Sequence, residues 1–234
     1  FIYVIPDFQN PSGKTWSVER RKKLVELANK YNTAIIEDNP YGELRFEGEI
    51  LPAVKHYDTE GRVAFLGTLS KILSPGLRLG WVVAEPELLS KFILVKQGAD
   101  LQSSTISQME AAKFFELYDI DEHIKKIIDL YRRRKDIMLK TMEEEFPEGV
   151  TYTNPEGGLF TWVVLPEYMN ARELAVKALE QKVAYVPGGS FFPNGGNENT
   201  FRLNYSSMDD ERIVEGIKRL SVALKEAMTE TVEA

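Results

Sequence analysis

The stretch GTLSKILSPGLRLGW, residues 67–81, follows the apolar run RVAFL at residues 62–66. The apolar run predicts a buried strand, and the Pro-Gly pair inside the quoted stretch predicts a sharp turn before a second strand. Lys71 lies between these features among small polar residues, and Arg78 follows it after seven positions. A strand, a lysine-bearing loop and a second strand in succession are the starting point for predicting the fold.

Apolar, β-rich runs predict four strands in the first half of the chain, at residues 1–5, 33–38, 62–68 and 78–84. Between the first two strands, Ser17 predicts the start of a helix with Leu24, Leu27 and Ala28 on its apolar face. Strand, helix and strand, followed by further strands at short spacing, are typical of a mostly parallel sheet flanked by helices. The predicted fold class is therefore α/β.

The second half of the chain has a different pattern. Residues 86–118 are expected to be helical, and a long amphipathic helix is predicted over residues 121–146. Beyond it we expect strands at 150–153, 158–166, 183–187 and 200–206, and helices at 171–181 and from 209. This pattern predicts two domains, residues 1–118 with the mostly parallel sheet and a smaller α+β domain at residues 119–234.

Composition excludes several functional classes. The 29 basic and 36 acidic residues give a net charge of −7, which argues against binding to nucleic acid or to an anionic membrane. The chain has no cysteine, which excludes disulfides and favours an intracellular, cytoplasmic setting. With His56 and His123 as its two histidines, we expect neither a histidine-built metal site nor a Ser-His-Asp triad. No apolar run is long enough to span a bilayer.

Polar residues follow three of the predicted strands, where the carboxyl ends of an open α/β sheet bind ligands. They are Asn10, Asp38, Tyr41, Thr68, Ser70 and Lys71, with Arg78 after the turn. Each has an ordinary structural explanation when taken alone. Asn10 and Asp38 precede turns and can hydrogen-bond their own backbone, the two hydroxyls can bond loop amides, both cations can be solvated, and Tyr41 can be a packing residue. A ligand site is favoured because all seven belong to one edge of the predicted sheet.

Four separated motifs carry a family resemblance: FQNPSG (8–13), IIEDNPYGEL (35–44), GTLSKILSPGLRLGW (67–81) and FRLNYS (201–206). In this order they resemble the fold type I, class I/II aminotransferases that depend on pyridoxal 5'-phosphate, closest to the 2-aminoadipate and kynurenine types. The resemblance implies transamination between an amino acid, with glutamate or a 2-aminoadipate-like donor, and a 2-oxo acid. It also implies a homodimer when the protein is full length.

The resemblance also implies a role for each candidate in the cofactor site. Lys71 would be the catalytic residue, forming a Schiff base with the cofactor and moving a proton at the substrate α-carbon. Asp38 would pair with the pyridinium nitrogen. Asn10 and Tyr41 would hydrogen-bond the phenolate oxygen of the ring. The remaining cofactor-binding residues would hold the phosphate, namely Thr68, Ser70 and Arg78.

For the substrate, the resemblance implies that Arg202 grips the α-carboxylate, with Asn10 beside it. Without the other motifs, the better interpretation of Arg202 would be a strand arginine paired with a nearby acid. Residues 1–118 would then be the C-terminal part of the large cofactor-binding domain. We expect an N-terminal part to be missing, because the chain begins without methionine inside a strand and lacks the glycine-rich loop and stacking aromatic residue of the family.

Two alternatives stay open on the same fold. The first is the aminotransferase-like ligand-sensing domain of a transcription regulator. Asn10 and Tyr41 favour the enzyme, since such regulators typically carry other residues at these positions. The second is a lyase or decarboxylase, because a fold alone does not determine the reaction. Arg202 favours transamination, since it would hold a carboxylate that the substrate retains.

Overall fold

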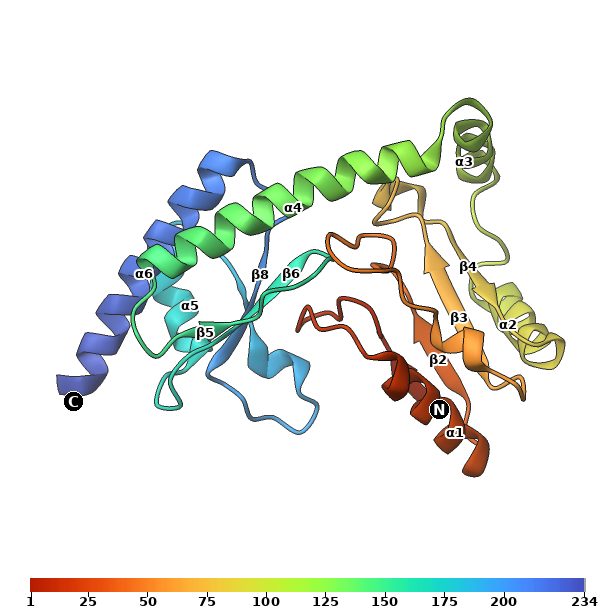
Figure 1. Cartoon of the computed structure of the whole chain (residues 1–234), viewed down its shortest axis with the longest axis horizontal. Coiled ribbons are helices and arrows are strands. Elements are labelled where there is room, and N and C mark those ends of the chain that lie inside the picture. Colours follow the sequence, from red (N-terminus) through yellow and green to blue (C-terminus); the bar gives the residue numbers. More distant parts are fainter. Residues whose placement is uncertain (234) are drawn as a thin grey trace. The chain divides into compact units, whose positions relative to one another are not determined.

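The computed structural model describes the backbone of residues 1–233 and the side chains of residues 1–229. The chain forms two compact units (Figure 1). Unit 1 holds Phe1–Gln9 and Lys14–Ile128, and unit 2 holds Asn10–Gly13 and the residues from Asp129 onward. The division falls inside one long helix, whereas the sequence-based boundary lies just ahead of that helix. The assignment of residues 1–118 and 119–234 to two domains stays a prediction.

Unit 1 contains a four-stranded sheet in the order β1-β2-β3-β4. Its strands are β1 (Ile2–Val4), β2 (Ile35–Asp38), β3 (Val63–Thr68) and β4 (Gly80–Val83). The first three strands are parallel, and β4 runs antiparallel to β3. The sequence therefore predicted correctly an α/β fold with a mostly parallel sheet. Since the three parallel strands end at the same edge, the residues that follow them are brought to one side of the sheet (Figure 1).

Helix α1 (Val18–Lys30) packs on this sheet, and Ser17 caps it by accepting a hydrogen bond from the backbone N–H of Arg20. Val25 and Ala28 of the helix join a core formed with Val4, Ile35, Val54 and Val63. The predicted apolar face was wrong at Leu27, which is exposed. Arg21 is buried instead, because its guanidinium reaches several acceptors below the helix.

The helical region after β4 is interrupted. Helix α2 (Pro86–Ala99) and helix α3 (Thr105–Leu117) are separated at residues 100–104, where Leu101 has a φ of +66°. Helix α4 (Ile120–Glu145) then begins in unit 1 and continues into unit 2. Short 3-10 turns, Val54–Tyr57 and Pro75–Leu77, complete unit 1. The sequence pattern located the helices but not the break, because no proline or glycine marks residues 100–104.

Unit 2 contains an antiparallel sheet in the order β5-β6-β8-β7. Its strands are β5 (Thr151–Tyr152), β6 (Phe160–Val164), β7 (Val186–Pro187) and β8 (Thr200–Asn204). Helices α5 (Ala171–Glu180) and α6 (Asp210–Glu233) pack against each other. The Ser221 hydroxyl of α6 donates a hydrogen bond to the backbone carbonyl of Glu145, which joins α6 to the end of α4. This is the α+β pattern predicted for the second half of the chain.

Candidate functional site

Asp38 and Thr68 are the last residues of two neighbouring parallel strands. Asp38 of β2 is paired with Leu66 of β3, and the backbone N–H of Asn39 donates to the carbonyl of Leu66 at 2.9 Å. Thr68 lies two residues beyond Leu66 on the same strand. The carboxylate of Asp38 and the hydroxyl of Thr68 therefore belong to the same edge of the sheet, as the sequence predicted.

The loop after β3 carries a pair of hydroxyls and a lysine. The hydroxyl oxygens of Thr68 and Ser70 lie 3.0 Å apart, and the backbone N–H of Ser70 donates to Thr68 Oγ1 at 3.1 Å. Lys71 follows at once and is half-buried. Within the described part of the chain, no hydrogen bond or ion pair engages its amine. The loop thus carries two hydroxyls and, next to them in the sequence, an amine without a hydrogen-bond or ion-pair partner among the described residues.

Arg78 lies at the end of the Pro75–Leu77 turn. Its φ of +55° is in the left-handed region, which is uncommon for a residue with a side chain. The guanidinium is exposed and donates one hydrogen bond, from Nη1 to the carbonyl of Pro75 at 3.1 Å. Most of its five N–H donors are therefore free to bind an anion.

Asp38 has a partner that the sequence did not reveal. The phenol of Tyr3, on β1, donates a hydrogen bond to Asp38 Oδ2 at 2.5 Å. Tyr41, which follows the Asn39-Pro40 turn three positions after Asp38, is buried. Partial burial, followed by the hydrogen bond and charge of Asp38, raises the pKa of Tyr3 well above its usual range. The alternation of side chains along a strand could have placed Tyr3 and Asp38 on one face, had the register been known.

Asn10 and Arg202 meet in unit 2. The Nη1 group of Arg202 on β8 donates to Asn10 Oδ1 at 2.6 Å, and both residues are half-buried. The guanidinium carbon lies 4.2 Å from the ring centre of Phe160 and 5.5 Å from that of Phe191. These distances are those of cation–π contacts, which hold the guanidinium plane in place. The sequence predicted Asn10 and Arg202 but not the two aromatic residues.

The turn before β6 is built on glycines. Gly158 has a φ of +76°, and the carbonyl of Gly157 accepts a hydrogen bond from the buried phenol of Tyr205 at 2.9 Å. Burial raises the pKa of Tyr205 well above its usual range, so this phenol stays a donor. Because Tyr205 follows β8, the contact joins the turn before Phe160 to the strand that carries Arg202.

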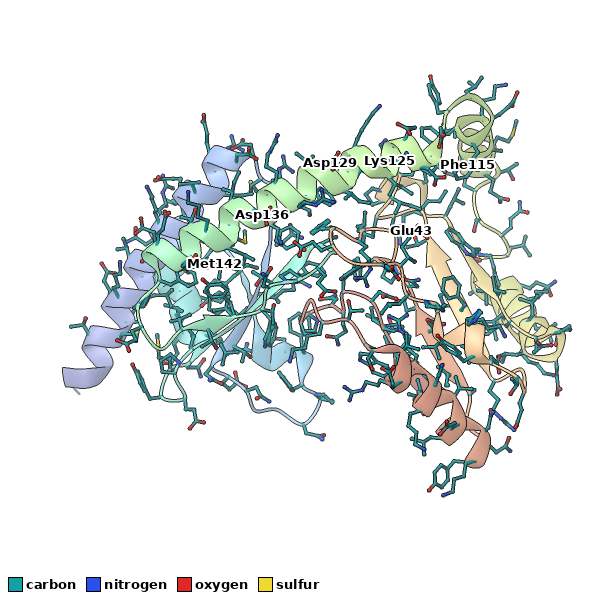
Figure 2. The ribbon with its side chains drawn as sticks, viewed as in Figure 1. Glu43, Phe115, Lys125, Asp129, Asp136 and Met142 are labelled. Atoms are coloured by element: carbon teal, nitrogen blue, oxygen red, sulfur yellow. The ribbon has the colours of Figure 1, made fainter. Side chains whose placement is uncertain are left out.

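A cavity with Thr68 in its lining adjoins the loop after β3. Its volume is about 360 Å³, and its mostly apolar lining includes Thr68, Trp81, Glu43 and Phe115 (Figure 2 labels the last two). A larger cavity of about 810 Å³ is lined by residues just ahead of β2 and β3 and by the start of α2, and none of the predicted site residues lines it. Its lining is charged and open to solvent. Of these two cavities, the smaller is the one lined by a predicted site residue, Thr68.

The candidates fall into two sets. Asn10 and Arg202 belong to unit 2, whereas Asp38, Tyr41, Thr68, Ser70, Lys71 and Arg78 belong to unit 1. Among the described residues, no hydrogen bond or ion pair connects Lys71 or Arg78 with Asp38. Nor do the described residues contain a cluster of three or more side chains suited to a metal ion. In the same part of the chain, no helix combines the length and the apolar character needed to cross a membrane.

Comparison with known proteins defines the class to which this fold and these residues belong. Residues 4–220 match the family described as aminotransferase class I and II. The chain belongs to this family, and its fold is that of a fold type I pyridoxal-phosphate aminotransferase, as the four sequence motifs indicated.

Individual relatives are similar along nearly the whole chain. It is 50% identical to aromatic-amino-acid aminotransferase 1 of Thermococcus litoralis, over 97% of this chain and 54% of that protein. The crystal structure of LysN, an α-aminoadipate aminotransferase of Thermus thermophilus complexed with N-(5'-phosphopyridoxyl)-L-leucine, matches with a TM-score of 0.94 and 41% identity, covering 98% of this chain and 60% of that one.

A third relative belongs to another functional class. The HTH-type transcriptional regulator YisV of Bacillus subtilis is 31% identical over 97% of this chain and 46% of that protein. The chain spans about half the length of these curated relatives.

Proposed function

We propose that this chain is the part of a pyridoxal-phosphate aminotransferase that carries the catalytic lysine, and that the protein moves an amino group from an amino acid to a 2-oxo acid. The observation that carries the proposal is the edge of the unit 1 sheet. There, Asp38 ends β2 and the Thr68-Ser70-Lys71 loop follows the neighbouring strand β3. Family membership and 50% identity to an aminotransferase support the same activity.

The residues at this edge fit pyridoxal 5'-phosphate by their chemistry. The phosphate needs several donors, and the Thr68 and Ser70 hydroxyls and the largely free guanidinium of Arg78 supply them. A protonated ring nitrogen needs an anionic acceptor, which is Asp38. Tyr41 would donate to the oxygen on the ring. When bound, the cofactor supplies an electron-accepting ring that stabilises negative charge on the substrate α-carbon.

Lys71 has two roles in this proposal. Its Nζ atom would hold the aldehyde carbon of the cofactor, a role that needs an amine not held in an ion pair. The same Nζ atom would take the proton from the substrate α-carbon and deliver it to the aldehyde carbon of the cofactor. Both roles suit a half-buried lysine that directly follows the Thr68 and Ser70 hydroxyls.

Arg202 and Asn10 are proposed to bind the substrate. Two N–H groups of a guanidinium match the two oxygens of an α-carboxylate, and the ring of Phe160 keeps the guanidinium plane in one orientation. Because Oδ1 of Asn10 accepts from Arg202, its Nδ2 group is the part that donates elsewhere. Asn10 would use this group toward the oxygen on the cofactor ring.

For the substrate side chain we propose broad specificity, with glutamate as donor and 2-oxoglutarate as its partner. The relatives described above are named for aromatic amino acids and α-aminoadipate, and one was crystallised with a leucine conjugate. A homodimer and a cytoplasmic location belong to the same proposal. The regulator alternative has less support, since the identity of 31% to YisV is well below 50%.

Kinetics of the protein that contains this chain test the proposal. Lys71→Ala should abolish transamination between glutamate and 2-oxo acids, while Lys91→Ala, an exposed lysine on α2, should retain it. Transamination that survives in Lys71→Ala would contradict the proposal. For specificity, rates are compared for 2-aminoadipate, glutamate, leucine, aromatic amino acids and aspartate. A preference for aspartate with 2-aminoadipate and leucine inert would contradict the broad specificity alone.

A further inference from the structure

Tyr3 and Asp38 lie on the same face of two neighbouring strands. Tyr3 of β1 is paired in parallel register with Ile36 of β2. Side chains alternate along a strand, so Ile36 and Asp38 point to the same face as Tyr3. The tyrosine side chain is long enough to reach past its partner Ile36 to Asp38, which is two residues further along and ends β2.

The contact between them has the geometry of a strong hydrogen bond. The Tyr3 phenol donates to Asp38 Oδ2 at 2.5 Å, within the range of about 2.5–2.7 Å that is usual when a hydroxyl donates to a carboxylate. Among the described residues, no other hydrogen bond to the Asp38 carboxylate is present. The orientation of this carboxylate therefore depends on Tyr3.

Packing alone does not account for the tyrosine. Its side chain is 53% exposed, so a large part of the ring gains nothing from burial. The phenol stays a donor, because partial burial and the neighbouring Asp38 raise the pKa of Tyr3. The feature that distinguishes Tyr3 from a phenylalanine at this position is its bond to Asp38.

We propose that Tyr3 is a positioning residue that holds the Asp38 carboxylate in the orientation needed to bind the pyridinium nitrogen of the cofactor. The terminal torsion of an aspartate is soft, and a carboxylate at the end of a strand rotates unless a donor holds it. With Oδ2 engaged by Tyr3, Oδ1 is the oxygen left to accept from the cofactor. The inference rests on the function proposed above for Asp38.

The first test needs no cofactor. Tyrosine labelled with ¹³C at the ζ position reports each phenol titration by NMR, and the pKa of Tyr3 should lie above the ordinary value of a tyrosine phenol. In Asp38→Asn the negative charge is gone, so the Tyr3 midpoint should fall by about one pH unit or more. A Tyr3 midpoint that is the same in both proteins would show that the hydrogen bond does not exist in solution.

The second test measures cofactor affinity in the protein that contains this chain. Tyr3→Phe keeps the ring and removes the hydroxyl, so pyridoxal phosphate should bind about two- to tenfold more weakly, because the Asp38 carboxylate must then be ordered when the cofactor binds. Tyr168→Phe is the matched control and should bind like the parent. The thermal midpoint of Tyr3→Phe should equal that of the parent, which separates positioning from loss of fold.

A double variant separates this inference from the proposed function. If Tyr3 acts through Asp38, the Tyr3→Phe/Asp38→Asn protein should bind cofactor no more weakly than Asp38→Asn alone. Losses of cofactor affinity that add up in the double variant would overturn the role of Tyr3 and leave the role of Asp38 intact. The same conclusion would follow if Tyr3→Phe bound cofactor like the parent while Asp38→Asn bound it more weakly. Parent-like affinity in Asp38→Asn would overturn both.

Discussion

Arg202 donates a hydrogen bond to Asn10 across 2.6 Å, although the two residues are separated by 192 positions in the sequence. Both belong to unit 2, because the short segment Asn10–Gly13 packs with the C-terminal half of the chain rather than with its sequence neighbours. A Cβ atom on Gly13 would lie 2.6 Å from the carbonyl oxygen of Phe160, so this close approach requires glycine. The QNPSG motif thus has a structural role in unit 2 as well as a proposed role in binding.

Arg202→Lys should weaken the binding of every amino-acid substrate. Lysine keeps the positive charge but loses the planar fork and the stacking on Phe160. We expect KM to rise at least about tenfold for all substrates alike, the equivalent of one hydrogen bond to a charged group. Steady-state kinetics measure the effect, and Arg172→Lys at an exposed position is the control. An increase confined to one substrate would show that Arg202 binds a side chain and not the α-carboxylate.

The Asp38→Asn variant should still bind cofactor at saturating concentration, but its kcat should be low. The link at Lys71 does not involve Asp38, whereas a neutral amide does not stabilise the positive charge of the pyridinium. We expect kcat to fall by at least about a hundredfold, the size of effect seen when one electrostatic contact to a reacting group is removed. Near-parent kcat would indicate that Asp38 is a turn residue.

Arg21→Met should destabilise the fold strongly. The Arg21 guanidinium is fully buried and donates to both carboxylate oxygens of Asp7, at 2.7 and 3.0 Å. Removing it leaves the buried Asp7 carboxylate with the longer ion pair to Arg45 at 3.7 Å in place of two short hydrogen bonds, which should cost about 3 kcal/mol. Lys23→Met breaks the exposed pair with Glu26 and should cost less than about 1 kcal/mol. Urea unfolding compares the two variants, and equal losses would refute the importance of the buried pair.

Asp58 should make stability depend on pH in the acid range. Burial of its carboxyl opposes the charge, but hydrogen bonds from Lys55 Nζ and from the backbone of Val63 and Arg62 outweigh it and lower the pKa of Asp58. Because the folded value lies below the unfolded one, the stabilisation is complete above about pH 4 and is lost as the pH falls further.

The test is the free energy of unfolding of Asp58→Asn between pH 7 and pH 3. The variant should be about 1–3 kcal/mol less stable than the parent at pH 7. The difference should shrink as the parent carboxylate becomes protonated. A difference that stays constant over the whole range would mean that the charge of Asp58 contributes nothing. Glu60→Gln, at an exposed acid in the same loop, is the control.

The sequence predicted the helices and strands better than it predicted which side chains contact one another. Strands and helices followed from apolar periodicity, so β2 and β3 and the ends that carry Asp38 and Thr68 were predicted correctly. Arg21 was not recognised as buried, because its acceptors come from residues 6, 7, 16 and 52, which only the folded chain brings together. Tyr3 was not recognised as a partner of Asp38, because the pairing depends on the register of two strands that are more than thirty residues apart.

The central claim is that Lys71 is the residue that bonds to the cofactor, and mass spectrometry after reduction tests it most directly. The protein that contains this chain is incubated with pyridoxal 5'-phosphate, reduced with borohydride and digested, and the modified peptide is sequenced. The account predicts one phosphopyridoxyl group on Lys71 and none after Lys71→Ala. A phosphopyridoxyl group on another lysine at equal yield, or an unmodified Lys71 in the parent, would contradict it.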